Sequence, residues 1–519
     1  MFLKHKILTL FGIALFPVAL SASDDADNNR QRQYKDILYL ENIRYGIDNP
    51  TSVSYSPLNH TADIKIGYNY KKGDFVNIDK SPKEKTLFID MSGTKKLKKT
   101  AFEGGIGYQN TIEYDRRWNS TLYIASDNPF ILADSVRSKY NVEKFILNGG
   151  FSWDALSFMK FGIKAHYEVG SSADQTDPRP DTKGMRFNIT PGLDFKLSEK
   201  LNIGVSLGGR LLNEEIKYTN VVGTTNYNFF LMNGLGCFYL QNGTSYQRRY
   251  KGSGWYGNLQ LMWDNHSFLS NIVSLGIDKN SERAEDGGTQ RLFIGGKYNR
   301  TQYDIYDRFS ILHENSAHNI TISASIHQID GIWYDQKSVT NDNGQTYWEI
   351  VNSSIKHKED RLEGTLKYRF DLLRHSVPTL TVNTGINFVQ SKTTNYPDIY
   401  LQKYNNLTIN ADISKHFSIK KSLLTITFSG NHKFNLSSSL YSDGITLAEQ
   451  YTIPMFDYLT ANHYGIYGKI ESKIPLNIQK LQSYIGIYLQ GSTQQYTGKS
   501  IHYSNTSYNQ IEGGIQFLF

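Results

Sequence analysis

Apolar and polar residues alternate with a period of two along most of the chain. In TADIKIGYNY (61–70), every second residue from Ile64 to Tyr70 is apolar or aromatic, and the residues between them are charged, amide or glycine. RLEGTLKYRF (361–370) follows the same pattern. Because successive side chains of a β-strand point to opposite faces, this alternation predicts strands with one apolar and one polar face.

Strand length and connection length distinguish a membrane barrel from a β-sandwich. Sandwich strands average about 5–6 residues. Most of the strands predicted here run for roughly 10–14 residues, and a tilted membrane-crossing strand needs about 9–11. Short and long connections also alternate along the chain, as in outer-membrane barrels. The short connections are 94–99, 154–157, 197–200, 264–267 and 372–378, and the long ones are roughly 113–141, 170–183, 213–251, 330–358 and 435–457.

We therefore predict an all-β, transmembrane antiparallel β-barrel with short periplasmic turns and long extracellular loops. About 18 strands are expected, with 14–18 as the range, because 289–312 reads as either two strands or one long one. The predicted strands are 61–71, 85–92, 100–112, 142–153, 157–169, 184–197, 200–212, 252–263, 267–278, 289–312, 317–329, 359–371, 377–390, 404–414, 422–434, 458–471, 480–491 and 506–519.

The N-terminal part of the chain divides into two segments before the barrel. Residues 1–22 have a basic start, an apolar run and small residues at its end, which predicts a secretory signal peptide. Residues 23–60 are mostly polar and form either a periplasmic leader or a segment that plugs the lumen. The barrel itself is expected to occupy residues 61–519.

Composition excludes several classes of function. The formal net charge of +7 is too small and too dispersed to indicate a nucleic-acid partner. The single cysteine, Cys237, excludes an intramolecular disulfide and a multi-cysteine metal site. The sequence HENSAH (313–318) has the wrong spacing for a zinc protease, which needs HExxH on a helix. We therefore predict no metal and no cofactor. The 36 Tyr and 27 Phe are the main deviation, and tyrosine concentrates at membrane interfaces.

Several motifs resemble those of an uncharacterised outer-membrane β-barrel family of Bacteroidetes-type bacteria. The matching stretches are DRRWNSTLY (115–123), FILADSV (130–136) and DQTDPRP (174–180), preceded by an Asn-Pro at Asn49 and Pro50. The resemblance is clearest over residues 45–215 and implies fold and location, because the family has no assigned activity. A fainter similarity to long-chain fatty-acid transporter barrels rests on the same Asn-Pro, which in that family lies in a segment that plugs the lumen. This similarity marks Asn49 and Pro50 as a candidate hatch.

Two charged stretches are candidates for contacts in the lumen or loops. In DRRW, Asp115, Arg116, Arg117 and Trp118 stand where a strand leads into a long loop. Paired arginines there would select anionic solutes, since guanidinium binds carboxylate and phosphate in a bidentate manner. The structural alternative is that the arginines pair with Asp115 and lipid headgroups, with Trp118 as an interface anchor.

The second charged stretch is DPRP, which contains Asp177 and Arg179 between two prolines. Each proline fixes its own φ and favours extended geometry in the residue before it, so a rigid loop is the main expectation. A ligand contact by Asp177 or Arg179 is the alternative.

The chain ends in QIEGGIQFLF (510–519), which resembles the signal recognised by the barrel assembly machinery of bacterial outer membranes. Glu512, Gly514, Phe517 and Phe519 match its polar, glycine and aromatic positions. The predicted location is therefore the bacterial outer membrane, and the predicted partners include its lipids and that assembly machinery.

Deletion of Phe519 is expected to lower the amount of protein at the cell surface, because the signal loses its terminal aromatic residue. Surface labelling of intact cells measures this amount. A truncated protein at normal surface levels would count against the barrel.

The function that these features favour is a channel or transporter for a small solute. The alternative is a non-enzymatic barrel subunit or scaffold of a larger outer-membrane uptake or secretion assembly, with neighbouring uptake proteins as partners. We predict no enzymatic activity, because the sequence contains no Walker loop, and turn composition explains its Asp-His combinations better than a catalytic site does.

Overall fold

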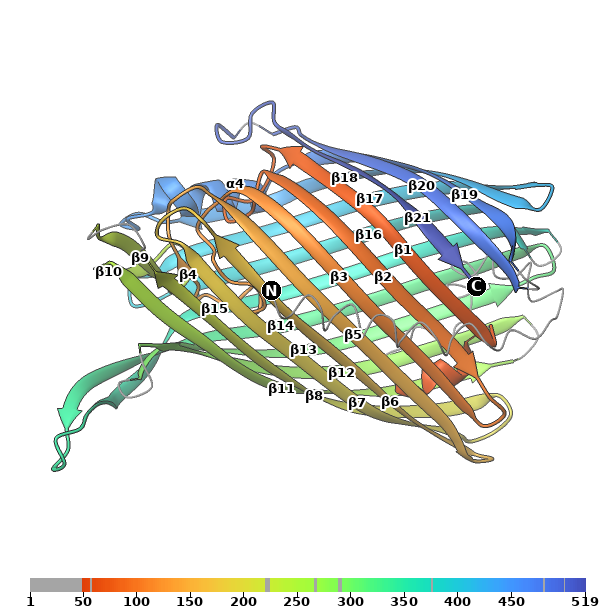
Figure 1. The fold of residues 1–519 in the computed structure, drawn as a ribbon, viewed down its shortest axis with the longest axis horizontal. Helices are drawn as coiled ribbons and strands as arrows, with labels where there is room; N and C mark the ends of the chain where they lie inside the picture. Colours follow the sequence, from red (N-terminus) through yellow and green to blue (C-terminus); the bar gives the residue numbers. More distant parts are fainter. Residues whose placement is uncertain are drawn as a thin grey trace.

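A computed structural model describes residues 49–56, 58–219, 225–265, 268–287, 292–374, 377–478, 481–498 and 500–519. Its strands form a closed antiparallel barrel of 18 strands, whose axis is roughly horizontal in Figure 1. The predicted fold class and strand number are confirmed, and the segment 289–312 contains one strand. The predicted signal peptide, residues 1–22, lies outside the described residues, and so do residues 23–48.

The barrel strands follow one another around the wall. They are β1 (His60–Gly73), β2 (Lys83–Lys96), β3 (Thr100–Arg116), β5 (Ser138–Leu156), β6 (Met159–Asp174), β7 (Pro180–Lys196), β8 (Leu201–Thr219), β11 (Ser245–Asp264), β12 (Leu269–Asp286), β13 (Phe293–Leu312), β14 (Ser316–Thr340), β15 (Thr346–Arg374), β16 (Val377–Asn395), β17 (Tyr400–Ile419), β18 (Ser422–Tyr441), β19 (His463–Ile478), β20 (Leu481–Tyr496) and β21 (Ser507–Leu518).

Six shorter elements within the described ranges are not part of the barrel wall. They are η1 (Pro50–Tyr55), β4 (Leu132–Ala133), β9 (Tyr227–Met232), β10 (Phe238–Gly243), the π-helical turn η2 (Ala448–Thr452) and α4 (Ile453–Leu459). Strands β4, β9 and β10 form a separate three-stranded sheet. None of the helices in the described ranges is long and apolar enough to cross a membrane.

The last strand closes the barrel on the first. β21 pairs with β20 on one side and with β1 on the other, where Ile515 lies opposite Ile66. The backbone N–H of Phe519 donates to the carbonyl of Ala62 at 2.8 Å, and the N–H of Ala62 donates to the carbonyl of Phe519 at 3.1 Å. Closure pairs the backbone groups that an open sheet would leave exposed at its edges.

The outward face of the wall is apolar on every strand. Each of the 18 barrel strands carries a large apolar side chain that is more than a third exposed. One representative per strand, in chain order, is Ile66, Leu87, Phe102, Leu147, Val169, Ile189, Leu207, Leu259, Leu275, Ile305, Ile322, Leu366, Ile386, Ile409, Phe428, Ile466, Leu489 and Ile515. The neighbours of these residues in each strand point inward and are mostly polar, as the alternation predicts.

The hairpin formed by β14 and β15 corrects the prediction of a long loop at 330–358. The two strands stay paired out to Thr340 and Thr346 and project beyond the barrel at the lower left of Figure 1. The pairing shifts register at Gly331/Ile332 and at Asp335/Gln336. Such bulges reverse the phase of the alternation, so the sequence pattern loses its period of two although the strands continue.

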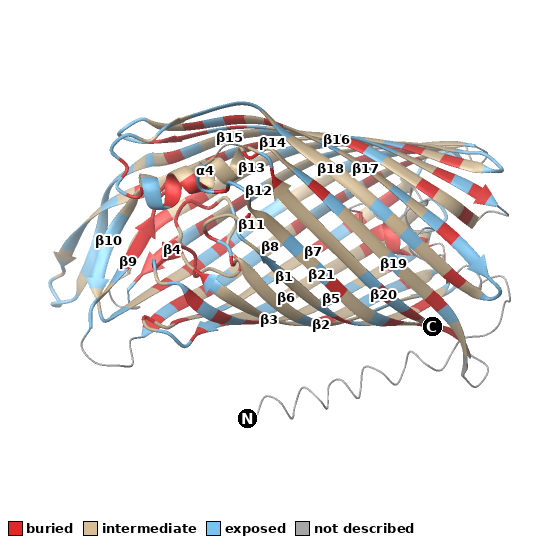
Figure 2. Cartoon of the chain, turned by 90° about the horizontal axis from the view of Figure 1, so that it is seen from above, coloured by how far each residue is buried: buried red, intermediate tan, exposed pale blue. Residues whose placement is uncertain are grey.

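The buried core of the molecule lies inside the end of the barrel with the long connections. One cluster joins Leu132 and Phe229 to the wall residues Ile216 and Tyr250, and a second surrounds Trp118. Figure 2 shows the buried residues gathered around β4 and β9 at this end, whereas the wall is mainly intermediate or exposed. Segments between strands are therefore packed within the barrel.

Candidate functional site

Residues 117–137, the connection between β3 and β5, fold into the lumen; we call them the inward loop. The backbone N–H groups of Leu122, Tyr123 and Ile124 donate to the carboxylate of Glu214 on β8, at 2.9, 2.6 and 3.2 Å. Glu214 is 3% exposed. A carboxylate that accepts three backbone donors makes charge-assisted hydrogen bonds, so Glu214 is a strong anchor for the loop.

A second buried carboxylate holds the next turn of the inward loop. Glu282 on β12 accepts from the backbone N–H of Ala125 at 3.0 Å and from Asn128 Nδ2 at 2.9 Å. The loop then returns across β11, where the hydroxyl of Tyr250 donates to the carbonyl of Phe130 at 2.8 Å. Both halves of the loop are thus fixed to the inner wall.

The tip of the inward loop reaches the far side of the lumen. The Asp127 carboxylate accepts from the Tyr298 hydroxyl on β13 at 2.6 Å and from Arg361 Nη2 on β15 at 3.0 Å. The loop starts at β3, so it crosses the inner side of the wall from β3 to β15. A loop of this kind narrows the path through a barrel.

Arg116 of the DRRW stretch is the last residue of β3, directly before the inward loop, and is buried. Its Nε donates to the carbonyl of Asn119 at 2.8 Å, and its Nη1 pairs with Glu113 at 2.9 Å. The sequence hypothesis paired the arginines with Asp115, but Asp115 is exposed and adopts a left-handed backbone with φ of 58°. The Arg116 guanidinium therefore fastens the start of the inward loop.

Arg117 and Trp118 lie at the same end of the barrel in different environments. Burial, followed by the positive charge of Arg137, lowers the pKa of Arg117. Trp118 is 1% exposed, and its ring lies 5.1 Å from that of Phe230 and 5.9 Å from that of Tyr451. The alternative of Trp118 as a membrane-interface anchor is therefore wrong, because its ring packs in the interior.

Two further connections cover the same end, and we call residues 225–244 and 442–462 the mouth segments. Asn395 Nδ2 on β16 donates to two backbone carbonyls of the first segment, at 2.8 and 3.1 Å. The Thr452 hydroxyl joins the two segments by donating to the carbonyl of Leu235 at 2.9 Å. The inward loop and both mouth segments meet in the aromatic cluster around Trp118.

The inner wall below these segments is polar and carries charges of both signs. Asp278 pairs with both Arg210 and Arg300, and Arg186 pairs with Glu168 at 2.6 Å. A cavity of about 290 Å³ opens beside the first group. It is lined by Thr190, Arg210, Tyr256, Asn258, Ile277, Asp278 and Asp304. The wall thus offers a polar surface without a strong excess of either charge.

The Asn-Pro of the candidate hatch lies on the inner wall near the short-turn end. Asn49 caps η1 by accepting from the backbone N–H of Thr51 at 3.0 Å, and its Nδ2 donates to the carbonyl of Leu193 on β7 at 2.9 Å. A Cβ on Gly192 would lie 2.6 Å from both Asn49 Oδ1 and Pro50 Cδ. Glycine is therefore required there, so that the segment can approach the wall.

Replacing Asn49 with alanine is expected to release η1 from the wall. The side chain makes four hydrogen bonds, and losing buried bonds of this kind costs about 1–3 kcal/mol. Hydrogen exchange of the backbone amides of 51–55 should accelerate. Asn59→Ala is the control, because Asn59 is exposed. Equal exchange in both variants would contradict the anchoring role of Asn49.

Asp177 and Arg179 lie in the connection between β6 and β7. Arg179 Nε lies 2.8 Å from Asp177 Oδ1, so the two side chains pair with each other. Arg179 has a left-handed backbone with φ of 49°. This geometry fits a shaped loop, and a ligand contact by either residue stays a prediction.

The four residues of the C-terminal motif take distinct places in β21 and at its end. Glu512 points inward, where it accepts from the Tyr488 hydroxyl at 3.0 Å and lies 3.6 Å from Lys65 Nζ. Phe517 lies opposite Ile64 on the outward face. Gly514 stands where β1 and Tyr488 approach the backbone closely. Their role as an assembly signal stays a prediction.

Asp134 in the inward loop is expected to make loop docking pH-dependent. Burial raises the pKa of Asp134 from its usual 3.8 to about 6, although hydrogen bonds from the Val136 N–H and the Tyr218 hydroxyl oppose the shift. The docked loop therefore binds a proton more tightly than the free loop, and docking strengthens as pH falls from about 6 towards 3.8. Hydrogen-exchange protection of residues 132–136 should be greater at pH 5 than at pH 7.5. Asp134→Asn should remove this difference, and a variant that keeps it would contradict the assignment.

The histidines of HENSAH lie apart from any cluster of metal ligands. His313 and Glu314 are in the turn between β13 and β14, and His318 Nδ1 lies 2.8 Å from the Tyr368 hydroxyl. In the part of the chain that the structure describes, no group of three or more His, Cys, Asp or Glu side chains is arranged to hold a metal ion.

Comparison with known proteins decides the family. Residues 50–519 match the Family of unknown function (DUF6850). The chain belongs to this family. No curated protein matches it in sequence.

Solved structures that resemble this DUF6850 barrel are distant from it in sequence. The outer membrane transporter YddB from Escherichia coli is 10% identical, with 88% of this chain and 81% of that chain covered and a TM-score of 0.40. The RagAB peptide importer is 7% identical, with 89% and 86% covered and a TM-score of 0.40. A Pseudomonas aeruginosa FadL homologue is 9% identical, with 91% and 93% covered and a TM-score of 0.33. At these values no function is transferred from them.

The anchors Glu214 and Glu282 of the DUF6850 barrel were not among the residues that the sequence pattern indicated. A signal for them exists in β8, where the inward positions on both sides of Glu214 are Leu212 and Ile216. Apolar residues on the inward face of a barrel strand predict that something packs against that wall. An acid between them is then a candidate partner for the packed segment.

Proposed function

We propose that the chain is an outer-membrane barrel that conducts a small polar solute and is gated by the inward loop. The observation that carries this proposal is the inward loop itself, held against the inner wall by the buried carboxylates Glu214 and Glu282. The loop starts at β3 and reaches Arg361 on β15, on the opposite side of the lumen, so it lies in the path of a solute. The mouth segments cover the same end.

The apolar outward face supports a location in a membrane. A closed barrel satisfies its own backbone hydrogen bonds, which hydrocarbon requires, and an outward apolar belt is the mark of an outer-membrane barrel. Every barrel strand contributes to the belt. The wall of 18 strands is also in the range at which barrels enclose an aqueous path.

The charges of the inner wall support a neutral or zwitterionic solute. The ion pairs of Asp278 with Arg210 and Arg300 leave little net charge to select one sign of ion. Selection would then depend on diameter and on hydrogen bonding with the amide, hydroxyl and tyrosine groups of the wall. The mechanism is diffusion through the lumen when the loop is displaced.

Reconstitution of the purified full chain tests this proposal. In planar bilayers we expect small, rare openings. In liposome-swelling assays we expect small neutral sugars to enter faster than larger ones, up to a maximum size. A variant with the inward loop released should conduct more in both assays. Silence of the wild type and of the released variant, with correct insertion of both, would overturn the proposal.

One observation favours the alternative of a subunit in a larger assembly. The projecting β14–β15 hairpin exposes apolar side chains beyond the barrel, among them Tyr347, Ile350 and Val351. A patch of this kind marks an interaction site. Shortening the hairpin by joining Asp335 to Asn352 through an Asn-Gly turn tests this function. Loss of a co-purified outer-membrane protein would support it, and an unchanged set of co-purified proteins would count against it.

We propose no enzymatic function for the loop residues that most resemble a hydrolase site. Ser500 Oγ and His502 Nδ1 both contact Asp457 Oδ2, at 2.5 and 2.8 Å. In a catalytic triad the serine hydroxyl would instead donate to Nε2 of the histidine, and Nδ1–H of the same ring would donate to the carboxylate. Both groups share one carboxylate oxygen, which suits a structural turn.

A further inference from the structure

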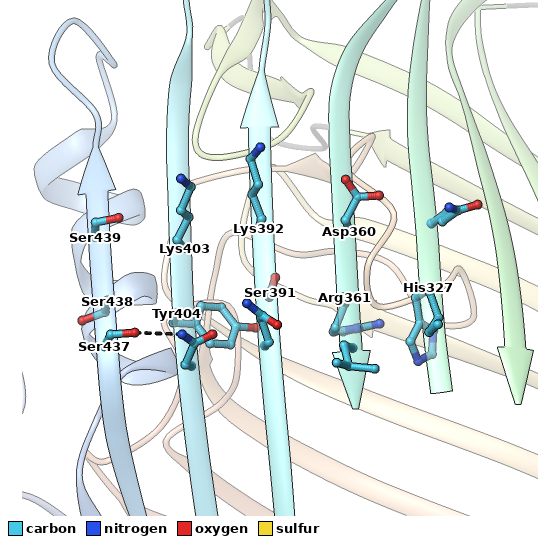
Figure 3. Close-up of a pocket in the computed structure, with 15 residues that line it drawn as sticks. His327, Asp360, Arg361, Ser391, Lys392, Lys403, Tyr404, Ser437, Ser438 and Ser439 are labelled. Carbon is cyan, nitrogen blue, oxygen red and sulfur yellow. Dashed lines mark hydrogen bonds between the residues drawn. The ribbon is translucent and has the colours of Figure 1, made fainter. Parts of the chain in front are cut away.

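A cavity of about 580 Å³ lies on the outward wall of strands β14–β18, near their long-connection ends. Figure 3 shows its lining residues as a band across these neighbouring strands. Ile326 and Leu362 line its edge and are 49% and 37% exposed on the outward face. The inward loop contacts Arg361 from the other side, and none of its described residues lines the cavity. The cavity therefore faces outward and away from the lumen.

Two lysines stand side by side in this cavity. Lys392 on β16 lies directly opposite Lys403 on β17, and both are exposed. Asp360 stands across from Lys392, and Ser439 stands across from Lys403. Within the described ranges neither ammonium group has a carboxylate within ion-pair distance. Like charges directly opposite each other destabilise a sheet, so an anion between them would be favourable.

Below the lysines the wall changes from polar to apolar in two steps. The next outward row holds Gln390, Asn405 and Ser437, with Asn405 Nδ2 donating to Ser437 Oγ at 2.8 Å. The row after that holds Phe388 and Leu407, which begin the apolar belt. The order of charge, amide and hydroxyl, then apolar surface matches the order of phosphate, polar linkage and acyl chain in a phospholipid or phosphorylated glycolipid.

We propose that this outward cavity binds the phosphorylated headgroup of a lipid in the outer leaflet. Lys392 and Lys403 would bind the phosphate as two point charges, because lysine binds phosphate through its ammonium group. Gln390 and Asn405 would hydrogen-bond the polar linkage, and the acyl chain would lie along Phe388. The site rests on the proposed membrane location but does not depend on conduction through the lumen.

Binding of lipid A to the purified full chain in nonionic detergent tests the site. The probes are lipid A with its phosphates, the same lipid A after enzymatic dephosphorylation, and inorganic phosphate. We expect the double variant Lys392→Gln/Lys403→Gln to bind phosphorylated lipid A about 30-fold more weakly, since each basic residue near an anionic lipid contributes roughly fivefold. The matched control is Lys98→Gln/Lys99→Gln, two exposed lysines in the turn between β2 and β3, and it should bind as the wild type does.

Three results would overturn the proposal. The first is equal binding of phosphorylated lipid A by the wild type and the cavity variant. The second is binding of dephosphorylated lipid A as tight as that of phosphorylated lipid A. The third is binding of inorganic phosphate alone as tight as that of the lipid. Thermal unfolding of both double variants verifies that they fold. A barrel that binds lipid but does not conduct would refute only the channel, and a conducting barrel that does not bind lipid would refute only this site.

Discussion

Replacing Glu214 with alanine is expected to release the inward loop and to raise the open probability of the barrel. The variant removes the acceptor of the N–H groups of Leu122, Tyr123 and Ile124. Hydrogen bonds to a charged group are each worth about 1.5–3 kcal/mol. A net loss of about 3 kcal/mol would change the ratio of docked to free loop by roughly 100-fold. The effect should therefore appear in single-channel recordings.

The neighbouring residue provides a matched control. Glu215 is half-buried on the opposite face of the same strand, where it pairs with Lys217 and Arg249, each at 2.8 Å. Partly exposed ion pairs contribute about 0–1 kcal/mol, so Glu215→Ala should leave loop and conductance unchanged.

Hydrogen exchange separates the anchor from the gate in the Glu214 experiment. Faster exchange of the amides of 122–124 in Glu214→Ala establishes that the loop has been released. If these amides exchange as in the wild type, Glu214 is not the anchor. If they exchange faster while conductance stays low, the inward loop is not the gate, and the mouth segments become the barrier to test.

Replacing Gly514 with alanine is expected to weaken closure of the barrel. A Cβ at this position would lie 2.5 Å from the carbonyl oxygen of Ile66 on β1 and 2.7 Å from the Tyr488 hydroxyl. The first contact is with backbone, so β21 and β1 would have to separate. Overpacking of this kind costs about 1–3 kcal/mol. Urea unfolding of the protein in detergent measures the loss, and the folded fraction in outer membranes should fall with it.

Gly513 is the control for this substitution, because it is next to Gly514 in the sequence but a side chain there would point to the opposite face of the strand. A Cβ on Gly513 would meet nothing closer than 3.5 Å. Gly513→Ala should therefore be neutral or slightly stabilising, because alanine lowers the entropy of the unfolded chain. Equal stability of the two variants would mean that the β1–β21 seam tolerates the extra methyl group and that the close approach does not limit closure.

The barrel wall was predictable because its information is local. Alternation in 61–70 identifies the faces of β1, and the same rule places Ile515 and Phe517 outward in β21. Such a pattern needs only a strand between an apolar and a polar environment. The prediction was wrong at the β14–β15 hairpin, where bulges at Val351 and Lys356 of β15 change the phase of the pattern.

The site was less predictable because its contacts are distant in sequence. The DRRW stretch correctly marked the entry into an important loop, but Arg116 pairs with Glu113 and not with Asp115. The direction that the loop takes is decided by Glu214, which is 92 residues from Leu122. An acidic side chain in a strand could accept hydrogen bonds from many segments, and the sequence pattern does not show which of them it contacts in the folded barrel.

The sequence by itself determined the strands, their two faces and the closing role of the C-terminal strand. The reason is that the period-two alternation and the terminal aromatic residues follow directly from the apolar environment outside the wall and the polar environment inside it. Only the tertiary structure decided that the inward loop folds into the lumen and that Asn49 lies against the wall near Gly192. The lumen is polar like bulk water, so a loop that enters it and a loop that stays outside have similar compositions. The difference arises from buried hydrogen bonds between segments that meet only after the barrel has closed.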